Sequence, residues 1–171
     1  MTRKPRNIVL LLLAAAVLAG ILWMFWPRPL AGTLDLEGQE IAASILTFGT
    51  EEVPGEEGPA VQPTIETERF LLPAGSAEAQ AVLDLLSGYT WHPCWETWTG
   101  ESGLSGIGPL SVTLYDQAGG QREFSVYSGT GKIRLNGQIV RLEYLGNETA
   151  AALSQELAHL LRTTASPAPT A

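Results

Sequence analysis

The chain has 171 residues, with ten Lys and Arg residues against eighteen Asp and Glu residues and a formal net charge of −8 at pH 7. Four of the ten basic residues precede residue 29, so the rest of the chain has six basic against eighteen acidic residues. Such a surface repels nucleic acid phosphates, which excludes DNA and RNA as partners. Cys94 is the single cysteine, so no internal disulfide can form and packing alone must hold the domain together.

Residues 8–26 form an unbroken apolar run, IVLLLLAAAVLAGILWMFW. As a helix with about 1.5 Å rise per residue, the run would cover roughly 28 Å, close to the thickness of the hydrocarbon core of a bilayer. Three basic residues precede the run and only Arg28 follows it closely. This charge bias predicts a single-pass anchor in the cell membrane, with residues 1–7 in the cytoplasm and the remaining domain outside.

A cleavable secretory signal is the alternative interpretation of this run. Signal peptides have shorter apolar regions of about 7 to 15 residues, and cleavage near Gly20 would leave residues 21–26 as an apolar new end. Trp23 and Trp26 stand where the run would meet the outer headgroups, a position that indoles favour. These features favour a retained signal-anchor.

The first half of the chain beyond the anchor predicts a linker, three strands and a loop. The linker covers residues 27–32, and a globular domain is expected over 33–163. Strands are predicted at 33–36, 41–48 and 64–72, the last from its alternating pattern. The apolar residues of 41–48 also have the spacing of a short helix, but Thr47 and Phe48 before Gly49 favour a strand. Residues 50–62 hold four glutamates, two glycines and two prolines, which predicts an exposed mobile loop.

The second half predicts helices and hairpins. A helix is expected between Ser76, a suitable N-cap, and Gly88. Strands at 110–115 and 123–127 alternate in polarity, and a turn at Gly119-Gly120 is expected to join them. Asn136-Gly137 is a strong type I′ turn signal. Closing that turn aligns Lys132 with Arg141 and places five residues on one apolar face: Ile133, Leu135, Val140, Leu142 and Tyr144.

A last helix is expected to begin at Asn147 and to bury a stripe that runs to Leu161. The fold class is therefore α+β: one transmembrane helix and a small domain with a mainly antiparallel sheet of five or six strands and two helices on one face. A disordered tail is expected over 164–171. In layout alone, the chain resembles the uncharacterised single-anchor extracytoplasmic proteins of Gram-positive bacteria, a resemblance that carries no functional motif.

Catalytic motifs are lacking in the sequence, so an enzyme is not predicted and no catalytic residue is assigned. The stretch SGTGK at 128–132 has Val126 and Ile133 where a phosphate loop needs Gly and Ser or Thr, so we interpret it as a turn. On an extended backbone His92, Cys94 and Glu96 would point the same way. No second cluster of ligands would complete a metal shell, so neither a metal nor a cofactor is expected.

Three tryptophans, Trp91, Trp95 and Trp98, form a candidate binding surface. Together they could build an aromatic platform for a glycan strand or a protein partner. The alternative is that they fill the space between a helix and the sheet.

Three basic residues, Lys132, Arg134 and Arg141, form a second candidate surface, because the predicted hairpin register gathers them in one place. Like charges opposed on a sheet are unfavourable. Either an acid such as Glu143 or Glu123 lies between them, or the patch receives an anion, such as a cell-wall polymer phosphate or an acidic segment of a partner.

These features predict a membrane-anchored extracytoplasmic binding or accessory module, with an envelope protein or a cell-wall polymer as its partner besides the membrane. One alternative is a structural subunit that docks on a larger membrane complex through its anchor, where Ala16 and Gly20 have the spacing of a close-packing face. The other alternative is a cell-envelope enzyme or metal-site protein that uses His92 and Cys94.

Overall fold

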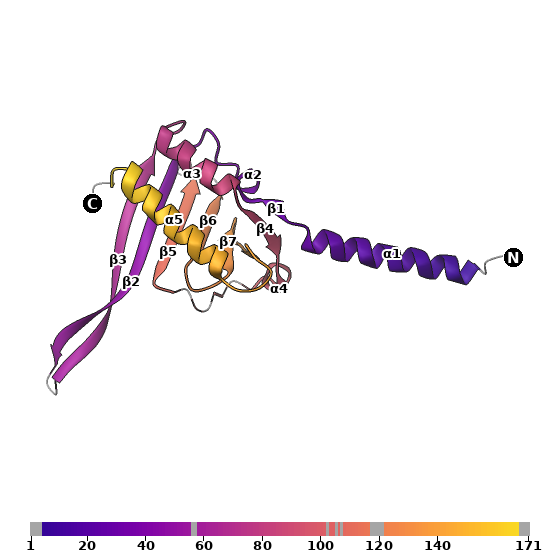
Figure 1. Cartoon of the computed structure of the whole chain (residues 1–171), viewed down its shortest axis with the longest axis horizontal. Helices are drawn as coiled ribbons and strands as arrows, with labels where there is room; N and C mark the ends of the chain where they lie inside the picture. The colour runs from indigo at the N-terminus through magenta and orange to yellow at the C-terminus, as the bar shows by residue number, and fades with distance from the viewer. Residues whose placement is uncertain are drawn as a thin grey trace.

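The computed structural model describes residues 5–55, 58–101, 103–104, 106, 108–116 and 122–167. It is an α+β fold in which a long N-terminal helix, α1 (Pro5–Phe25), projects from a domain built on an antiparallel sheet (Figure 1). The predicted class and the antiparallel sheet are thus confirmed. The predicted element count is too low, because the described residues form eight strands and five helices.

The strands lie in the order β1-β4-β8-β7-β6-β5-β2-β3, and each neighbouring pair is antiparallel. After α1, the elements in chain order are β1 (Arg28–Pro29), α2 (Leu30–Leu34), β2 (Ile41–Gly55), β3 (Gly58–Leu72), α3 (Ala77–Ser87), β4 (Thr90–Pro93), α4 (Trp95–Thr99), β5 (Leu110–Asp116), β6 (Glu123–Tyr127), β7 (Lys132–Leu135), β8 (Gln138–Arg141) and α5 (Glu148–Thr164).

Helices α3 and α5 cover one face of the sheet (Figure 1). The Oγ of Ser76 accepts a hydrogen bond from the Ala79 N–H at 3.1 Å, so the predicted N-cap of α3 is confirmed. In α5, Leu153, Leu157 and Leu161 recur every four residues and are fully buried. They pack into one core with the alternate residues of the strands, among them Ile41, Ile45, Val112, Leu114, Phe124, Val126, Ile133 and Val140.

The β7–β8 hairpin has the predicted turn and register. Asn136 and Gly137 both have positive φ, 49° and 79°, as a type I′ turn requires. Leu135 pairs with Gln138 and Lys132 pairs with Arg141. The Gly119-Gly120 turn expected between β5 and β6 lies outside the described residues.

The loop prediction for residues 50–62 is wrong, because β2 and β3 continue as a paired ribbon to Gly55 and Gly58. Residues 56 and 57 lie outside the described part of the chain. The pairing of β2 with β5 stops at Thr47 opposite Leu110, so the ribbon beyond it extends away from the sheet (Figure 1). A ribbon with both faces in solvent needs no apolar alternation, which explains why its composition suggested a loop.

The chain enters the sheet within the predicted linker. Arg28 and Pro29 form β1 and pair with β4, and Leu30 starts α2 and is fully buried. Residues 33–36, predicted as a strand, contain the end of α2 instead. Leu30 and Leu34 lie one helical turn apart and both enter the core, which favours a helix over a strand.

Two further boundaries differ in detail from the sequence-based expectations. The side chain of Asn147 makes no capping bond to α5; the Glu143 carboxylate accepts a hydrogen bond from the Thr149 N–H at 3.2 Å instead. In the predicted tail, Thr164 still belongs to α5 and Pro167 forms an isolated bridge with Phe70. Residues 168–171 lie outside the described part of the chain.

Candidate functional site

The three tryptophans of the predicted platform occupy different environments. Trp91 lies in β4 with 5% of its surface exposed, and its Nε1–H donates to the Thr33 hydroxyl at 2.9 Å. Trp95 and Trp98 lie on α4 and are 70% and 49% exposed. Only the latter two can therefore contact a ligand without a rearrangement of the core.

The change from strand to helix at Cys94 separates these tryptophans. The Thr97 hydroxyl accepts a hydrogen bond from the Cys94 N–H at 3.0 Å and donates to the backbone oxygen of Ile139 in β8. Gly100, in the left-handed region at φ 72°, ends the helix. Thr97 therefore attaches one side of α4 to β8. Trp95 and Trp98 remain on the side of α4 that is exposed.

The end of α1 packs beside α4. The Trp23 and Trp98 ring centroids are 6.2 Å apart, and the guanidinium of Arg28 lies 5.0 Å from the ring centroids of both Trp23 and Trp91. Such cation–π contacts stabilise the junction between α1 and β4.

A short segment after β8 completes the junction. Tyr144 is 6.2 Å from Phe25 between ring centroids, and its hydroxyl donates to the Phe25 backbone oxygen. We define the aromatic face as the exposed aromatic and apolar residues at the end of α1, on α4 and directly after β8: Trp23, Phe25, Trp26, Trp95, Trp98, Tyr144 and Leu145. Tyr144 was predicted on the apolar core face of the hairpin, but β8 ends at Arg141 and Tyr144 leaves the sheet, 53% exposed.

The side chains of His92 and Cys94 contact other groups of the domain. His92 is 5% exposed and stacks on Tyr144 with ring centroids 4.0 Å apart. Its Nδ1 lies 3.2 Å from the Pro93 oxygen, and its buried Nε2 has no hydrogen-bond partner within the described structure. The Cys94 Sγ lies 3.5 Å from the Ile139 oxygen. Glu96 belongs to α4 rather than to an extended run with these two residues, and the described residues contain no cluster of three metal-ligating side chains.

The basic residues Lys132 and Arg141 lie opposite each other, as the predicted register requires. Lys132 forms an ion pair with Glu96 of α4. The Arg141 guanidinium donates to the backbone oxygens of Glu143 at 3.0 Å and Gly146 at 2.9 Å. The two opposed charges thus each have a partner within the chain.

Arg134, the third basic residue, is half-buried and pairs in register with Ser125 of β6 and Ile139 of β8. The structure therefore brings all three predicted basic residues onto neighbouring strands. The acid paired with Lys132 is Glu96 of α4. The Glu143 carboxylate accepts hydrogen bonds from Thr149, and the Glu123 carboxylate accepts one from Ser125. The function of this patch as an anion site stays a prediction.

The Glu96–Lys132 pair predicts an acid-dependent contribution to stability. The hydrogen bond from Lys132 lowers the pKa of Glu96 from 4.5 to about 2. A carboxyl group whose pKa is lower in the folded state stabilises the fold above its unfolded pKa and loses this contribution as pH falls. We expect Glu96→Gln to lower the unfolding free energy by about 1 kcal/mol at neutral pH. In chemical denaturation, this difference from wild type should shrink between pH 4.5 and pH 2; a difference that is constant over this range would contradict the assignment.

The glycines of the SGTGK stretch serve close backbone packing. A Cβ on Gly129 would collide with the backbone of Gly106 and Gly108, and one on Gly131 would collide with the Gly146 oxygen. Both positions therefore exclude side chains because neighbouring loops occupy the space. This packing agrees with the turn predicted there.

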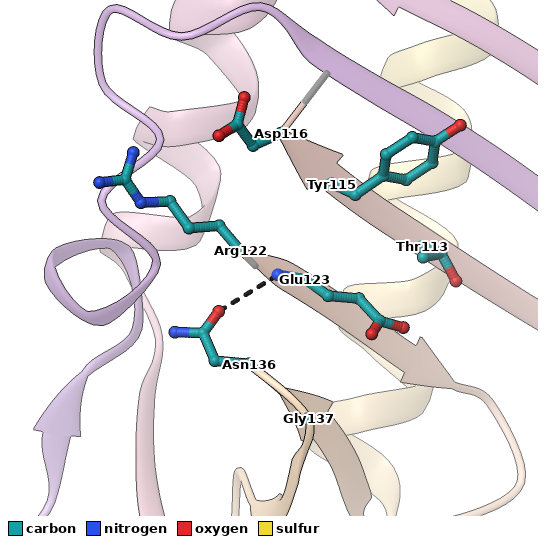
Figure 2. A pocket seen from close by; sticks show the side chains of 7 residues that line it. All are labelled: Thr113, Tyr115, Asp116, Arg122, Glu123, Asn136 and Gly137. Atoms are coloured by element: carbon teal, nitrogen blue, oxygen red, sulfur yellow. Dashed lines mark hydrogen bonds between the residues drawn. The ribbon is translucent and has the colours of Figure 1, made fainter. Parts of the chain in front are cut away.

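A cavity of about 510 Å³ opens at the ends of β5 and β6 (Figure 2). Its polar side chains bind groups of the chain itself. Asn136 accepts a hydrogen bond from the Glu123 N–H at 3.1 Å and donates to the Thr33 oxygen at 3.3 Å. Arg122 forms an ion pair with Asp35 at 2.8 Å. These contacts join the sheet to the segment around α2, so we assign the cavity no ligand.

The β2–β3 ribbon is the feature that sequence reasoning missed. We define the ribbon arm as residues 48–55 and 58–65, the part of the two strands beyond β5. Phe48, Val61 and Ile65 are 36%, 64% and 62% exposed. An available signal was the near mirror symmetry of the sequence VPGEEGPA at residues 53–60, which is compatible with two strands that pair with each other.

Comparisons with family models, with curated proteins and with solved structures each found no match to this chain.

Proposed function

We propose that the protein is a membrane-anchored extracytoplasmic binding module whose ribbon arm binds an envelope protein. Helix α1 contains an 18-residue window, Ile8–Phe25, that is long and apolar enough to cross a membrane and has no buried residues. The three basic residues before this window support a cytoplasmic N-terminus. The domain that carries the arm would then lie outside the membrane.

The observation that carries this proposal is the ribbon arm itself. Among the described residues, no third strand pairs with this ribbon beyond Thr47, and an isolated two-stranded ribbon is only marginally stable in water. Exposed apolar side chains on such a ribbon are typical of a surface that a partner covers. Binding would bury Val61 and Ile65 and thereby stabilise the ribbon.

The charge of the arm defines the chemistry of the partner. Between residues 48 and 66 the sequence has five glutamates and no lysine or arginine. Glu68, just below the arm, is already paired with Arg162 of α5. We therefore propose a partner with a groove that combines apolar and basic residues.

A shortened arm tests the proposal. Gly49 pairs with Thr64, so replacing residues 50–63 by Asn-Gly would close the ribbon with the turn type that Asn136 and Gly137 already make. With a photocrosslinking amino acid at position 48 in cells that naturally contain the protein, we expect one crosslinked protein for the full arm and none for the shortened arm. The adduct should decrease at high salt, because it depends on exposed charges.

The control places the same photocrosslinker at Glu37, an exposed residue outside the arm. Equal thermal unfolding of the full and shortened forms would show that the domain is intact. If the shortened arm still gives the adduct, the arm is not the binding element.

A second candidate function is that of a structural subunit that docks on a larger membrane complex through α1. Ala16 and Gly20 lie one turn apart in the Ile8–Phe25 window of α1, which has no buried residue in the described structure, and a Cβ on Gly20 would meet no described atom within 4 Å. Small residues at this spacing favour close helix packing in membranes. Exchanging α1 for an unrelated transmembrane helix would abolish association under this alternative and leave binding through the arm unchanged.

A further inference from the structure

We infer that the aromatic face of the domain rests in the headgroup layer of the same membrane that α1 spans. This inference rests on the proposed anchoring and identifies the lipid surface as the ligand of Trp95, Trp98, Tyr144 and Leu145.

The chain between α1 and the domain is too short to hold the two apart. Helix α1 ends at Phe25, and Arg28 is already paired with Trp91 in the sheet. The Leu30 N–H then donates to the Tyr89 oxygen at 3.0 Å. The end of α1 and the edge of the sheet therefore form one continuous structure.

The depth of the aromatic face follows from this connection. The apolar window Ile8–Phe25 covers about 27 Å as a helix, close to the hydrocarbon thickness of about 30 Å, and the polar layer on each side adds roughly 5 to 8 Å. The ring centroids of Trp98 and Tyr144 lie 6.2 Å from those of Trp23 and Phe25, at the outer end of that window. An anchor that spans the bilayer would thus place both rings within the polar layer.

The composition of the face suits that layer. Tryptophan and tyrosine favour the boundary between hydrocarbon and headgroups. Leu145 is 86% exposed, a large apolar side chain that bulk water solvates poorly. The exposed aromatic residues of α1 and of the domain are continuous across the Trp23–Trp98 contact, so one medium can cover both.

Charge does not oppose this placement, although the domain as a whole is acidic. The neighbouring carboxylates Glu96 and Glu143 are bound to Lys132 and to Thr149. The acidic ribbon arm belongs to β2 and β3, at the opposite edge of the sheet from β1 and away from α1 (Figure 1). The acidic arm that is proposed to bind the partner therefore lies at the edge of the sheet away from α1.

Depth-dependent fluorescence quenching tests the inference on the full-length chain. Cys94→Ser gives a cysteine-free background, because Cys94 is the single cysteine. An environment-sensitive fluorophore is then attached to Leu145→Cys, with Trp95→Cys as a second exposed site, in phosphatidylcholine vesicles with brominated acyl chains. We expect quenching several-fold stronger at both sites than at the matched control Val61→Cys on the ribbon arm.

A third label at Ile21→Cys separates this inference from the proposed anchoring. Quenching at position 21 with none at 145 and 95 would overturn the membrane contact and leave the anchor intact. Quenching at none of the three positions would overturn both. These vesicles contain no glycan and no other protein, so neither can cover the aromatic face in this experiment. If a second copy of the chain covered the face, the fluorescence of the label at 145 would change with the number of chains per vesicle and not with brominated lipid. That result would also overturn the inference.

Discussion

Phe124→Ala is expected to lower the free energy of unfolding by about 3 to 5 kcal/mol. Phe124 is fully buried in β6, where it pairs in register with Leu114 on one side and Leu135 on the other, and α5 packs over it. Removing its ring would leave a cavity that strands on both sides cannot close. Because small domains have total unfolding free energies of about 5 to 15 kcal/mol, this single change removes a large part of the stability of the domain.

Chemical denaturation of the chain in detergent, followed by circular dichroism in the far ultraviolet, would measure this loss. Tyr115→Ala is the matched control, since Tyr115 is an aromatic residue of the adjacent strand that points away from the core and is 40% exposed. We expect the control to cost clearly less. Equal losses for the two variants would show that the core does not lie on the α5 side of the sheet.

The central elements of the fold were predictable because their signals are local. Polar and apolar residues alternate in β5 and β6, and the Asn136-Gly137 turn specifies its own register, so these strands needed no tertiary information. Helices α3 and α5 each present an apolar stripe at helical spacing. Because each of these elements buries only one face, its apolar residues recur at the spacing of a strand or a helix, and the sequence predicts the element.

Elements that lack such one-sided burial were missed. None of the described side chains of the ribbon arm is buried, so neither the alternation nor the hydrophobicity of a typical strand was required of it. Helix α4 has only five residues and none of them is buried. Its position depends on the contact of Thr97 with the distant Ile139 oxygen, which no local pattern encodes.

In the candidate sites too, contacts between residues close in sequence were predicted, whereas contacts between residues distant in sequence were not. The register of Lys132 and Arg141 follows from a two-residue turn and was predicted. The partner of Lys132 was not, because Glu96 lies 36 residues away on α4. The three tryptophans were treated as one surface because they share one stretch of sequence, whereas a strand and a helix divide that stretch at Cys94.

The division of the tryptophans leads to a sharp prediction for Trp91. Trp91→Ala should lower the unfolding free energy by about 3 to 5 kcal/mol, as expected for a buried tryptophan. Its ring fills the junction between β1 and β4, lies 5.0 Å from the Arg28 guanidinium and binds the Thr33 hydroxyl. The loss should therefore include the contacts that join α1 to the domain.

Two further variants identify the cause of that loss. Trp91→Phe keeps an aromatic ring and removes the indole N–H, so we expect a cost of about 1 kcal/mol from the hydrogen bond together with a smaller packing term. Trp95→Ala removes an indole that is 70% exposed and should change stability by no more than about 0.5 kcal/mol when the chain is in detergent. If Trp95→Ala were as destabilising as Trp91→Ala, α4 would be part of the core, and Trp95 could not be the residue that the membrane covers.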